Sequence, residues 1–195
     1  MKYNNEIIRE QYSQGIKFEY IFFDSENPVT PENNKFTDEP IQKNFFGKNY
    51  DRMFKVDGQR FFSFAGYMMF NQAKISMQQS QHNFEAYRAM LGDVLKSKKG
   101  IKKYMKADKK LWSEQMHEVA LKGNLEKFSQ NLELKDYLIS TGDKILVDVN
   151  AKDDVWGIGY SRGNIKNPYK WNGQNLLGFC LMEVRDMLRG ESSDR

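Results

Sequence analysis

The chain has 195 residues, 39% of them hydrophobic, which is enough for one well-buried core and short for two. Its 30 Lys and Arg against 26 Asp and Glu leave a mild formal charge of +4. The single cysteine, Cys180, excludes a disulfide within the chain, and no stretch approaches the ~18 uninterrupted apolar residues of a membrane-spanning helix. We therefore expect a soluble, cytoplasmic protein with one domain.

The N-terminal third is expected to hold a strand, a long loop and a hairpin. Residues 1–17 are polar, carry charges where a signal peptide needs an apolar run, and are predicted to be a lead-in to the domain. "FEYIFF" (18–23) predicts a strand, and residues 24–44, with three of the four prolines, predict a surface loop. "MFKVDGQRFFSF" alternates around Asp57-Gly58, which is typical of a β-hairpin.

Helical spacing dominates the rest of the chain, so the expected class is α+β: one compact domain over residues 18–190, mostly helical with a few short strands, and a flexible tail after it. Asp108 is a candidate N-cap for a long helix that runs through "LEKFSQN". A short strand, "KILVDV", and a glycine-rich basic loop lead to the final helix. The predicted helices span residues 64–78, 83–96, 109–131 and 175–188, and the predicted strand spans residues 144–149.

A lysine-rich stretch favours anionic partners. Residues 96–110 hold eight lysines and one aspartate. Such a run can be a solvated helix face, or it can supply salt-sensitive attraction to phosphates. The two histidines, His82 and His117, lie far apart with no cysteine or carboxylate at ligand spacing, so neither a metal site nor a cofactor is expected.

The start of the final helix is a candidate phosphate site, because the first amides of a helix have no partner within it. Asn175 is the candidate N-cap, and the glycine-rich loop before it could let its backbone approach a ligand. The alternative is a capped helix after an ordinary surface loop. Spacing leaves both open, and the loop residues that could contribute are Gly157, Gly159, Arg162, Lys166 and Lys170.

"DDVWGIG" combines a carboxylate, a tryptophan and two glycines in a predicted loop. Asp153 could activate water or stabilise positive charge that develops on a sugar, and Trp156 could stack on a flat ring. Alternatively, Trp156 fills the core and Asp153 caps a turn. The residues alone favour neither interpretation.

Five segments together resemble the NADAR family, also called YbiA-like: "GYMM", "DKKLW", "LEKFSQN", "LISTGDKILVDVNAKDDVWGIG" and "WNGQNLLGFCLMEVRDML". The resemblance runs from about Phe18 to Leu188. It implies a compact α+β domain that hydrolyses N-glycosidic bonds, with a pocket for a ribose phosphate or ADP-ribose group. Some relatives act on early riboflavin-pathway intermediates, and others remove ADP-ribose from guanine bases modified by DarT-type toxins.

The resemblance also implies site residues. Asp153 and Trp156 fall on the family's aspartate and tryptophan, and Trp112 on the tryptophan after the basic segment. Tyr67 falls on the helix tyrosine. The Asn-Leu-Gly element, which would bind substrate beside Gly157, falls on Asn175, Leu176 and Gly178.

Four polar positions of the family are changed. Ala65 stands in place of a glutamate and Gln72 in place of a lysine. Lys74 could replace that lysine as a catalytic group only if the helix is offset, because two positions differ by about 200° on a helix. The nearest replacements for the family's Ser-Asn and Gly-Arg elements, and candidate substrate contacts, are Lys48, Asn49 and, beside Gly100-Ile101, Lys99.

Three functions stay open at this stage. The first is a hydrolase that removes ADP-ribose from modified guanine in nucleic acid, with Asp153 as the main catalytic carboxylate. The second is a binding protein that has lost turnover and sequesters an ADP-ribose-like ligand or modified nucleic acid, which the changes at Ala65 and Gln72 favour. The third is a hydrolase of riboflavin-pathway ribosyl intermediates, which leaves the lysine-rich stretch unexplained.

Overall fold

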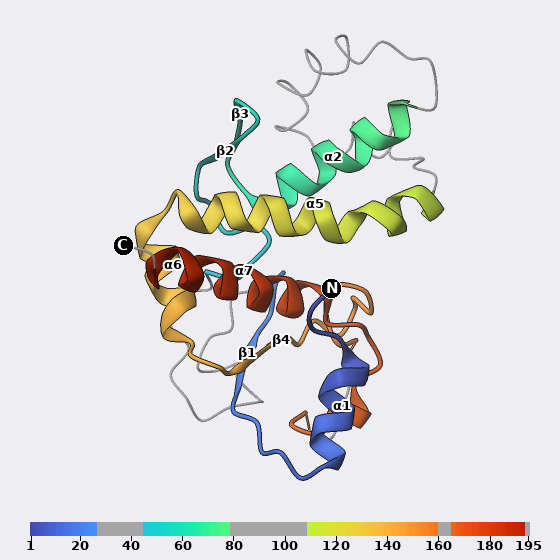
Figure 1. Ribbon diagram of the computed structural model, residues 1–195. Helices are drawn as coiled ribbons and strands as arrows, with labels where there is room; N and C mark the ends of the chain where they lie inside the picture. The colour runs from blue at the N-terminus through green and yellow to red at the C-terminus, as the bar shows by residue number, and fades with distance from the viewer. Residues whose placement is uncertain (27–44, 79–108, 160–164, 194–195) are drawn as a thin grey trace.

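Three long helices form the centre of the fold, with α5 between the other two (Figure 1). They are α2 (Phe64–Gln78), α5 (Lys109–Ser129) and α7 (Leu176–Ser193). Short strands accompany them, so the predicted α+β architecture is confirmed. The computed structural model describes residues 1–26, 45–78, 109–159 and 165–193. The predicted loop at 27–44, the helix at 83–96, the Asp108 cap and most of the lysine-rich stretch lie outside these ranges.

In the described part of the chain, two small sheets flank the helices (Figure 1). β1 (Tyr20–Phe23) pairs in parallel with β4 (Ile145–Asp148), in the register Tyr20↔Ile145 to Phe23↔Asp148. β2 (Phe54–Val56) and β3 (Gln59–Phe61) form the predicted antiparallel hairpin. Its two turn residues, Asp57 and Gly58, have φ values of 49° and 78°, as a tight turn of type I′ requires.

The helix α2 begins where its sequence spacing predicts and is helical to the end of the described range. Ser63 precedes it, and the Ser63 hydroxyl oxygen accepts a hydrogen bond from the Gly66 N–H at 3.2 Å. This side-chain cap satisfies one of the amides that the first turn leaves without a partner. Within the described residues, no helix is long and apolar enough to cross a membrane.

The N-terminal lead-in is a docked part of the fold. It forms α1 (Asn5–Ser13), and the Asn4 side chain caps it by accepting from the Ile7 N–H. Ile8 is the buried residue of this helix. The Arg9 guanidinium donates to the main-chain oxygens of Pro168 and Trp171, at 3.1 and 2.9 Å. The helix was not predicted because most of its residues are polar, although the Asn4 cap and the amphipathic spacing were available signals.

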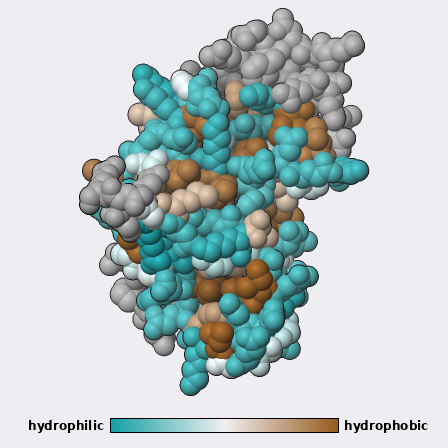
Figure 2. All heavy atoms as spheres, viewed as in Figure 1, coloured by the Kyte–Doolittle hydropathy of each residue, from teal (hydrophilic) through white to brown (hydrophobic). Residues whose placement is uncertain are grey.

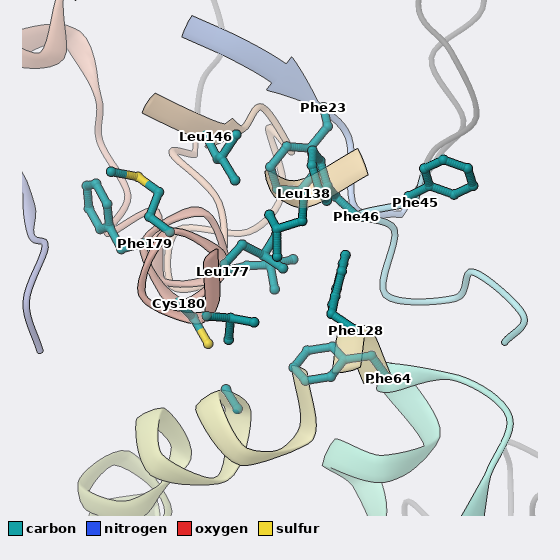
Figure 3. Close-up of a cluster of buried hydrophobic side chains, with 14 of the residues drawn as sticks. Phe23, Phe45, Phe46, Phe64, Phe128, Leu138, Leu146, Leu177, Phe179 and Cys180 are labelled. Carbon is teal, nitrogen blue, oxygen red and sulfur yellow. The ribbon is translucent and has the colours of Figure 1, made fainter. Parts of the chain in front are cut away.

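Buried aromatic and aliphatic side chains from both sheets and the helices meet in one core (Figure 3). Phe128 of α5 packs on Phe46 with ring centres 6.2 Å apart, Phe64 of α2 belongs to the same cluster, and α6 (Leu132–Ser140) contributes Leu138. Cys180 of α7 is fully buried in this cluster and acts as a small apolar side chain, as predicted. On the face of the molecule that Figure 2 shows, hydrophilic side chains predominate and hydrophobic ones gather in small separate areas.

Helix α7 lies unusually close to β4 because residue 178 is glycine. A Cβ on Gly178 would overlap the main-chain oxygen of Leu146 and the side-chain amide of Asn175. The polar group that fills this contact is Asn175, whose side chain donates to Leu146 O at 2.9 Å and accepts from the Asp148 N–H at 3.0 Å. Asn175 therefore provides hydrogen-bond partners for the main-chain groups of Leu146 and Asp148, as a neighbouring strand would.

Two alanine substitutions in α7 should have opposite effects on stability. Gly178→Ala is expected to lower the free energy of unfolding by at least about 1–3 kcal/mol, because backbone rather than a flexible side chain must move. Gly190→Ala is the matched control, since nothing lies within 4 Å of a Cβ there. It should raise stability by about 0.5–1 kcal/mol through helix propensity. Urea denaturation of both variants checks this, and equal effects would contradict the close contact at Gly178.

Candidate active site

An ion pair between Lys48 and Asp153 joins two segments that are far apart in the sequence. The Lys48 ammonium nitrogen lies 2.9 Å from Oδ2 of Asp153 and 3.0 Å from Oε1 of Glu26. The Lys48 and Asp153 side chains are only 11% and 20% exposed, whereas Glu26 is 47% exposed. This pair brings together two of the predicted site residues.

Both members of the pair are held in their charged forms. Burial by itself raises the pKa of Asp153, but the Lys48 ammonium and the N–H groups of Trp156 and Val155 outweigh it, so the net shift is downward. Burial likewise opposes the charge of Lys48, but hydrogen bonds to Asp153 and Glu26 raise its pKa overall. Asp153 is therefore available as an anion near neutral pH.

The loop after β4 fixes the direction of the Asp153 carboxylate. Its Oδ1 accepts hydrogen bonds from the Val155 and Trp156 N–H groups at 3.1 and 2.8 Å. Gly157 sits where this loop folds back, and a Cβ there would lie 3.0 Å from the main-chain oxygens of Asp148 and Asp153. Only the second carboxylate oxygen thus remains for Lys48 and for chemistry.

The start of α7 is engaged by this same loop, which corrects the expected phosphate site. The N–H groups of Leu176 and Leu177 donate to the main-chain oxygens of Val155 and Trp156, at 3.1 and 3.0 Å. Asn175 has no exposed surface, and both ends of its side chain bond to β4. These groups hold the loop that carries Asp153, so they are not free to hold a phosphate.

Gly178 was predicted to bind substrate, but its small size allows the close contact between α7 and β4. Of the loop residues that could contribute to a phosphate site by sequence, Arg162 lies outside the described residues. Gly159 has φ of 55° and serves the loop's turn. Lys166 and Lys170 are exposed beside the short 3₁₀ helix η1 (Pro168–Lys170).

Trp156 and the first turn of α2 border the ion pair. The Trp156 ring meets the edge of Phe64 with ring centres 6.5 Å apart, and Trp156 remains partly exposed. The Ala65 N–H donates to the main-chain oxygen of Lys48 at 2.8 Å. Position 65, where the resemblance expects a glutamate, therefore adjoins the residue that binds Asp153.

A buried lysine that the sequence interpretation did not single out supports the loop carrying Lys48. Lys127 of α5 is 1% exposed, and its ammonium donates to the main-chain oxygens of Phe45 and Gly47 at 3.2 and 3.5 Å. The ring of Tyr50 lies 5.6 Å from the same nitrogen. Burial lowers the pKa of Lys127 to about 7. Its place in "LEKFSQN", in helical register with buried Ala120 and Asn124, was the available signal.

A buried aspartate supports the other side of the pair and was also missed. Asp148, the last residue of β4, is fully buried, and its Oδ1 accepts from the Ser25 and Asn150 N–H groups at 3.0 and 3.2 Å. Ser25 in turn receives the Lys48 N–H at its main-chain oxygen. Burial raises the pKa of Asp148 to about 6. Its position in an apolar strand gave little reason to expect a site residue.

Of the other predicted site residues, Asn49 adjoins the ion pair through Glu26, whereas Tyr67 and Lys74 lie on the hairpin side of α2. Tyr67 is buried between the hairpin and α5, and Lys74, the proposed replacement lysine, lines a cavity on that side of α2. Trp112 packs against the core from α5. Asn49 is exposed and donates to Glu26 at 3.3 Å, and Lys99 lies outside the described residues. Among the described residues, no three His, Cys, Asp or Glu side chains gather as metal ligands.

A sequence model described as the NADAR domain matches residues 27–189, which is most of the chain and includes both members of the ion pair. The chain belongs to the NADAR family. The resemblance found in its motifs is thereby confirmed.

Named NADAR relatives match over part of their length. "N-glycosidase R617" of Acanthamoeba polyphaga mimivirus is 38% identical over 78 residues, 39% of this chain and 46% of that protein. "Protein irg-1" of Caenorhabditis elegans is 37% identical over 81 residues, 40% of this chain and 38% of that protein. "N-glycosidase YbiA" of Escherichia coli is 35% identical over 80 residues, 41% and 44% of the two chains. The aligned part spans less than half of each relative.

The NADAR fold extends beyond these alignments. The solution structure of Escherichia coli YbiA superposes with a TM-score of 0.59 and covers 92% of this chain and 90% of that one. Its sequence identity is 22%, so the comparison establishes a shared fold.

Proposed function

We propose that this NADAR protein is an N-glycoside hydrolase that removes ADP-ribose from modified guanine bases in nucleic acid, reversing the product of a DarT-type toxin. The observation that carries the hydrolytic part is Asp153, an ionised, partly exposed carboxylate held by Lys48 beside Trp156. The names of the N-glycosidase relatives support the same bond type.

The chemistry follows from the charge on Asp153. As an N-glycosidic bond breaks, positive charge develops on C1′ and the ring oxygen of the sugar, and a nearby carboxylate stabilises it. The same carboxylate can accept a proton from water as the water oxygen bonds to C1′. The bonding electrons leave with the base, which takes up a proton. Lys48 keeps Asp153 ionised, and a partly exposed Trp156 offers a surface for a flat ring.

The choice of nucleic acid as substrate rests on charge. The lysine-rich stretch at residues 96–110 would add attraction to phosphates that a small substrate does not need. This part of the proposal therefore predicts binding that weakens as salt concentration rises.

A second candidate is a binding protein without turnover. The observation that favours it is Ala65, since position 65 adjoins Lys48 and lacks the acid that the family usually has there. Loss of a general acid costs about 10²–10⁴ in rate, and a neighbouring residue must have hydrogen-bond reach to replace it. The third candidate, hydrolysis of riboflavin-pathway ribosyl intermediates, shares the Asp153 chemistry.

One assay separates the three functions. The purified protein is incubated with DNA carrying ADP-ribose on guanine, and in parallel with a riboflavin-pathway ribosyl intermediate. Mass spectrometry follows loss of the adduct, and filter binding follows retention of the DNA. Release of ADP-ribose from DNA is the expected result. Tight retention without release would replace the proposal by the binding function, and turnover of the small compound alone would replace it by the third.

A further inference from the structure

A cavity of about 390 Å³ lies between the β2–β3 hairpin, α2 and α5, and the proposed hydrolysis does not use it. Its volume falls in the range of about 300–1,000 Å³ that small-molecule sites occupy. The described residues that line it are Val56, Asp57, Gln59, Phe61, Tyr67, Phe70, Asn71, Lys74, Glu118, Val119 and Lys122.

A buried phenylalanine separates this cavity from the candidate active site. The Phe64 ring stacks on Tyr67 with ring centres 6.4 Å apart, and its edge contacts Trp156 at 6.5 Å. Phe64 itself is 1% exposed. Tyr67, which lines the cavity, and Trp156, which borders Asp153, are therefore on different sides of a packed ring.

The Tyr67 side chain forms an ordered floor with an unused hydrogen-bonding group. Its ring is 2% exposed, meets the edge of Phe61 at 5.1 Å, and packs where Gly123 leaves room, since a Cβ on Gly123 would overlap the ring. Among the described residues, none hydrogen-bonds to its hydroxyl. Because Tyr67 lines the cavity, its hydroxyl is available to donate to a bound ligand.

The hydroxyl is a donor at any ordinary pH. Burial, together with the charge of Asp57 in the same cavity, raises the pKa of Tyr67 to about 12. An acceptor is also present: the Asn71 amide nitrogen donates to the main-chain oxygen of Tyr67 at 2.9 Å, which leaves the Asn71 amide oxygen. The site thus offers a donor and an acceptor on one helix face, one turn apart.

The charges around the cavity balance. The Lys122 ammonium pairs with both carboxylate oxygens of Asp57, at 2.8 and 2.7 Å. The remaining lining charges, Lys74 and Glu118, are again one of each sign. A phosphate would meet two carboxylates as well as two ammonium groups, so this composition favours an uncharged ligand over an anion.

Aromatic walls complete the recognition chemistry. Phe61 and Phe70 pack edge to face at 5.4 Å, and Tyr67 lies against the same Phe61 ring. Flat rings are bound by such surfaces, and convergent polar groups fix their orientation. We propose that this cavity is a second ligand site, for an uncharged planar heteroaromatic ring of nucleobase size that accepts from Tyr67 and donates to Asn71.

The test titrates the full chain with adenine and uracil, observed by ¹H–¹⁵N NMR. A ligand of this size is expected to bind with Kd on the order of 1 mM. Saturable shifts should appear at the Gly123 and Asn71 amides. Tyr67→Phe removes only the hydroxyl and should weaken binding about tenfold, which is the loss of one hydrogen bond of roughly 1.4 kcal/mol. Asp153→Asn should leave these shifts intact, which separates this site from the proposed hydrolysis.

The matched control is Tyr20→Phe. The Tyr20 hydroxyl is buried without a hydrogen-bond partner, and burial raises its pKa to about 12, as for Tyr67, but Tyr20 lies in β1, outside the cavity. This variant should bind both bases as the wild type does. The proposal is overturned if neither base gives saturable shifts at the cavity, if Tyr67→Phe binds equally well, or if the shifts center on the Trp156 indole instead.

Discussion

Asp153→Asn should reduce release of the base by about 10²–10⁴ while the protein stays folded. The substitution keeps Oδ1, so the hydrogen bonds from Val155 and Trp156 that shape the loop can persist. It removes the negative charge that would stabilise the sugar cation or accept a proton from water. Single-turnover kinetics on the ADP-ribosylated DNA measure the change, and circular dichroism with thermal unfolding checks the fold.

The neighbouring Asp154 supplies the control. Its side chain is exposed, and Asp154→Asn makes the same change in charge one residue away. Its rate should remain within about twofold of the wild type, since exposed substitutions have small effects. Equal losses in both variants would indicate a general effect of charge on binding, and full activity of Asp153→Asn would remove Asp153 from the mechanism.

Lys127→Met should make the protein relatively more stable at low pH than at high pH. In the folded state burial lowers the Lys127 pKa to about 7 from its usual 10.5. Between these values the unfolded chain binds more protons, so the wild type gains stability as pH rises, and the penalty of burying the charge is complete below pH 7. Methionine carries no such charge.

The measurable quantity is the free energy of unfolding of Lys127→Met minus that of the wild type. It should fall by about 3 kcal/mol between pH 7 and pH 10, because one pKa unit corresponds to about 1.4 kcal/mol. Urea denaturation at several pH values gives it, and all other titrating groups cancel in the difference. Lys152→Met, at an exposed position, should change stability by less than about 0.5 kcal/mol. A difference independent of pH would show that Lys127 is not destabilised by its burial.

Part of the candidate site was predictable from local sequence. Asp153 and Trp156 stand three residues apart in a family motif, and the hydrogen bonds from Val155 and Trp156 N–H to the Asp153 carboxylate are local to that motif. Lys48 was predicted only as the nearest residue to a changed family element. Its partner could not be read from spacing, because 105 positions separate it from Asp153.

The predicted phosphate site at Asn175 shows the limit of local reasoning most clearly. A polar residue before a helix is a good N-cap in general. Here the strand β4 and the Asp153 loop occupy the groups concerned: the Asn175 side chain bonds to Leu146 and Asp148, and the first helix amides bond to Val155 and Trp156. Buried backbone N–H and C=O groups must be hydrogen-bonded, and here their partners are the Asn175 side chain and the first amides of the helix.

The sequence by itself determined the α+β class, the hairpin at Asp57-Gly58, the start of α2 and the family, because periodicity, turn chemistry and motif spacing are local properties. Tertiary structure alone decided that Lys48 pairs with Asp153 and that Tyr67 and Lys74 face a separate cavity. It also decided that Lys127 and Asp148 are buried next to the loops that carry Lys48 and Asp153. Those outcomes depend on which backbone groups and charges are removed from water when distant segments pack together. The spacing of residues in the sequence does not contain that information.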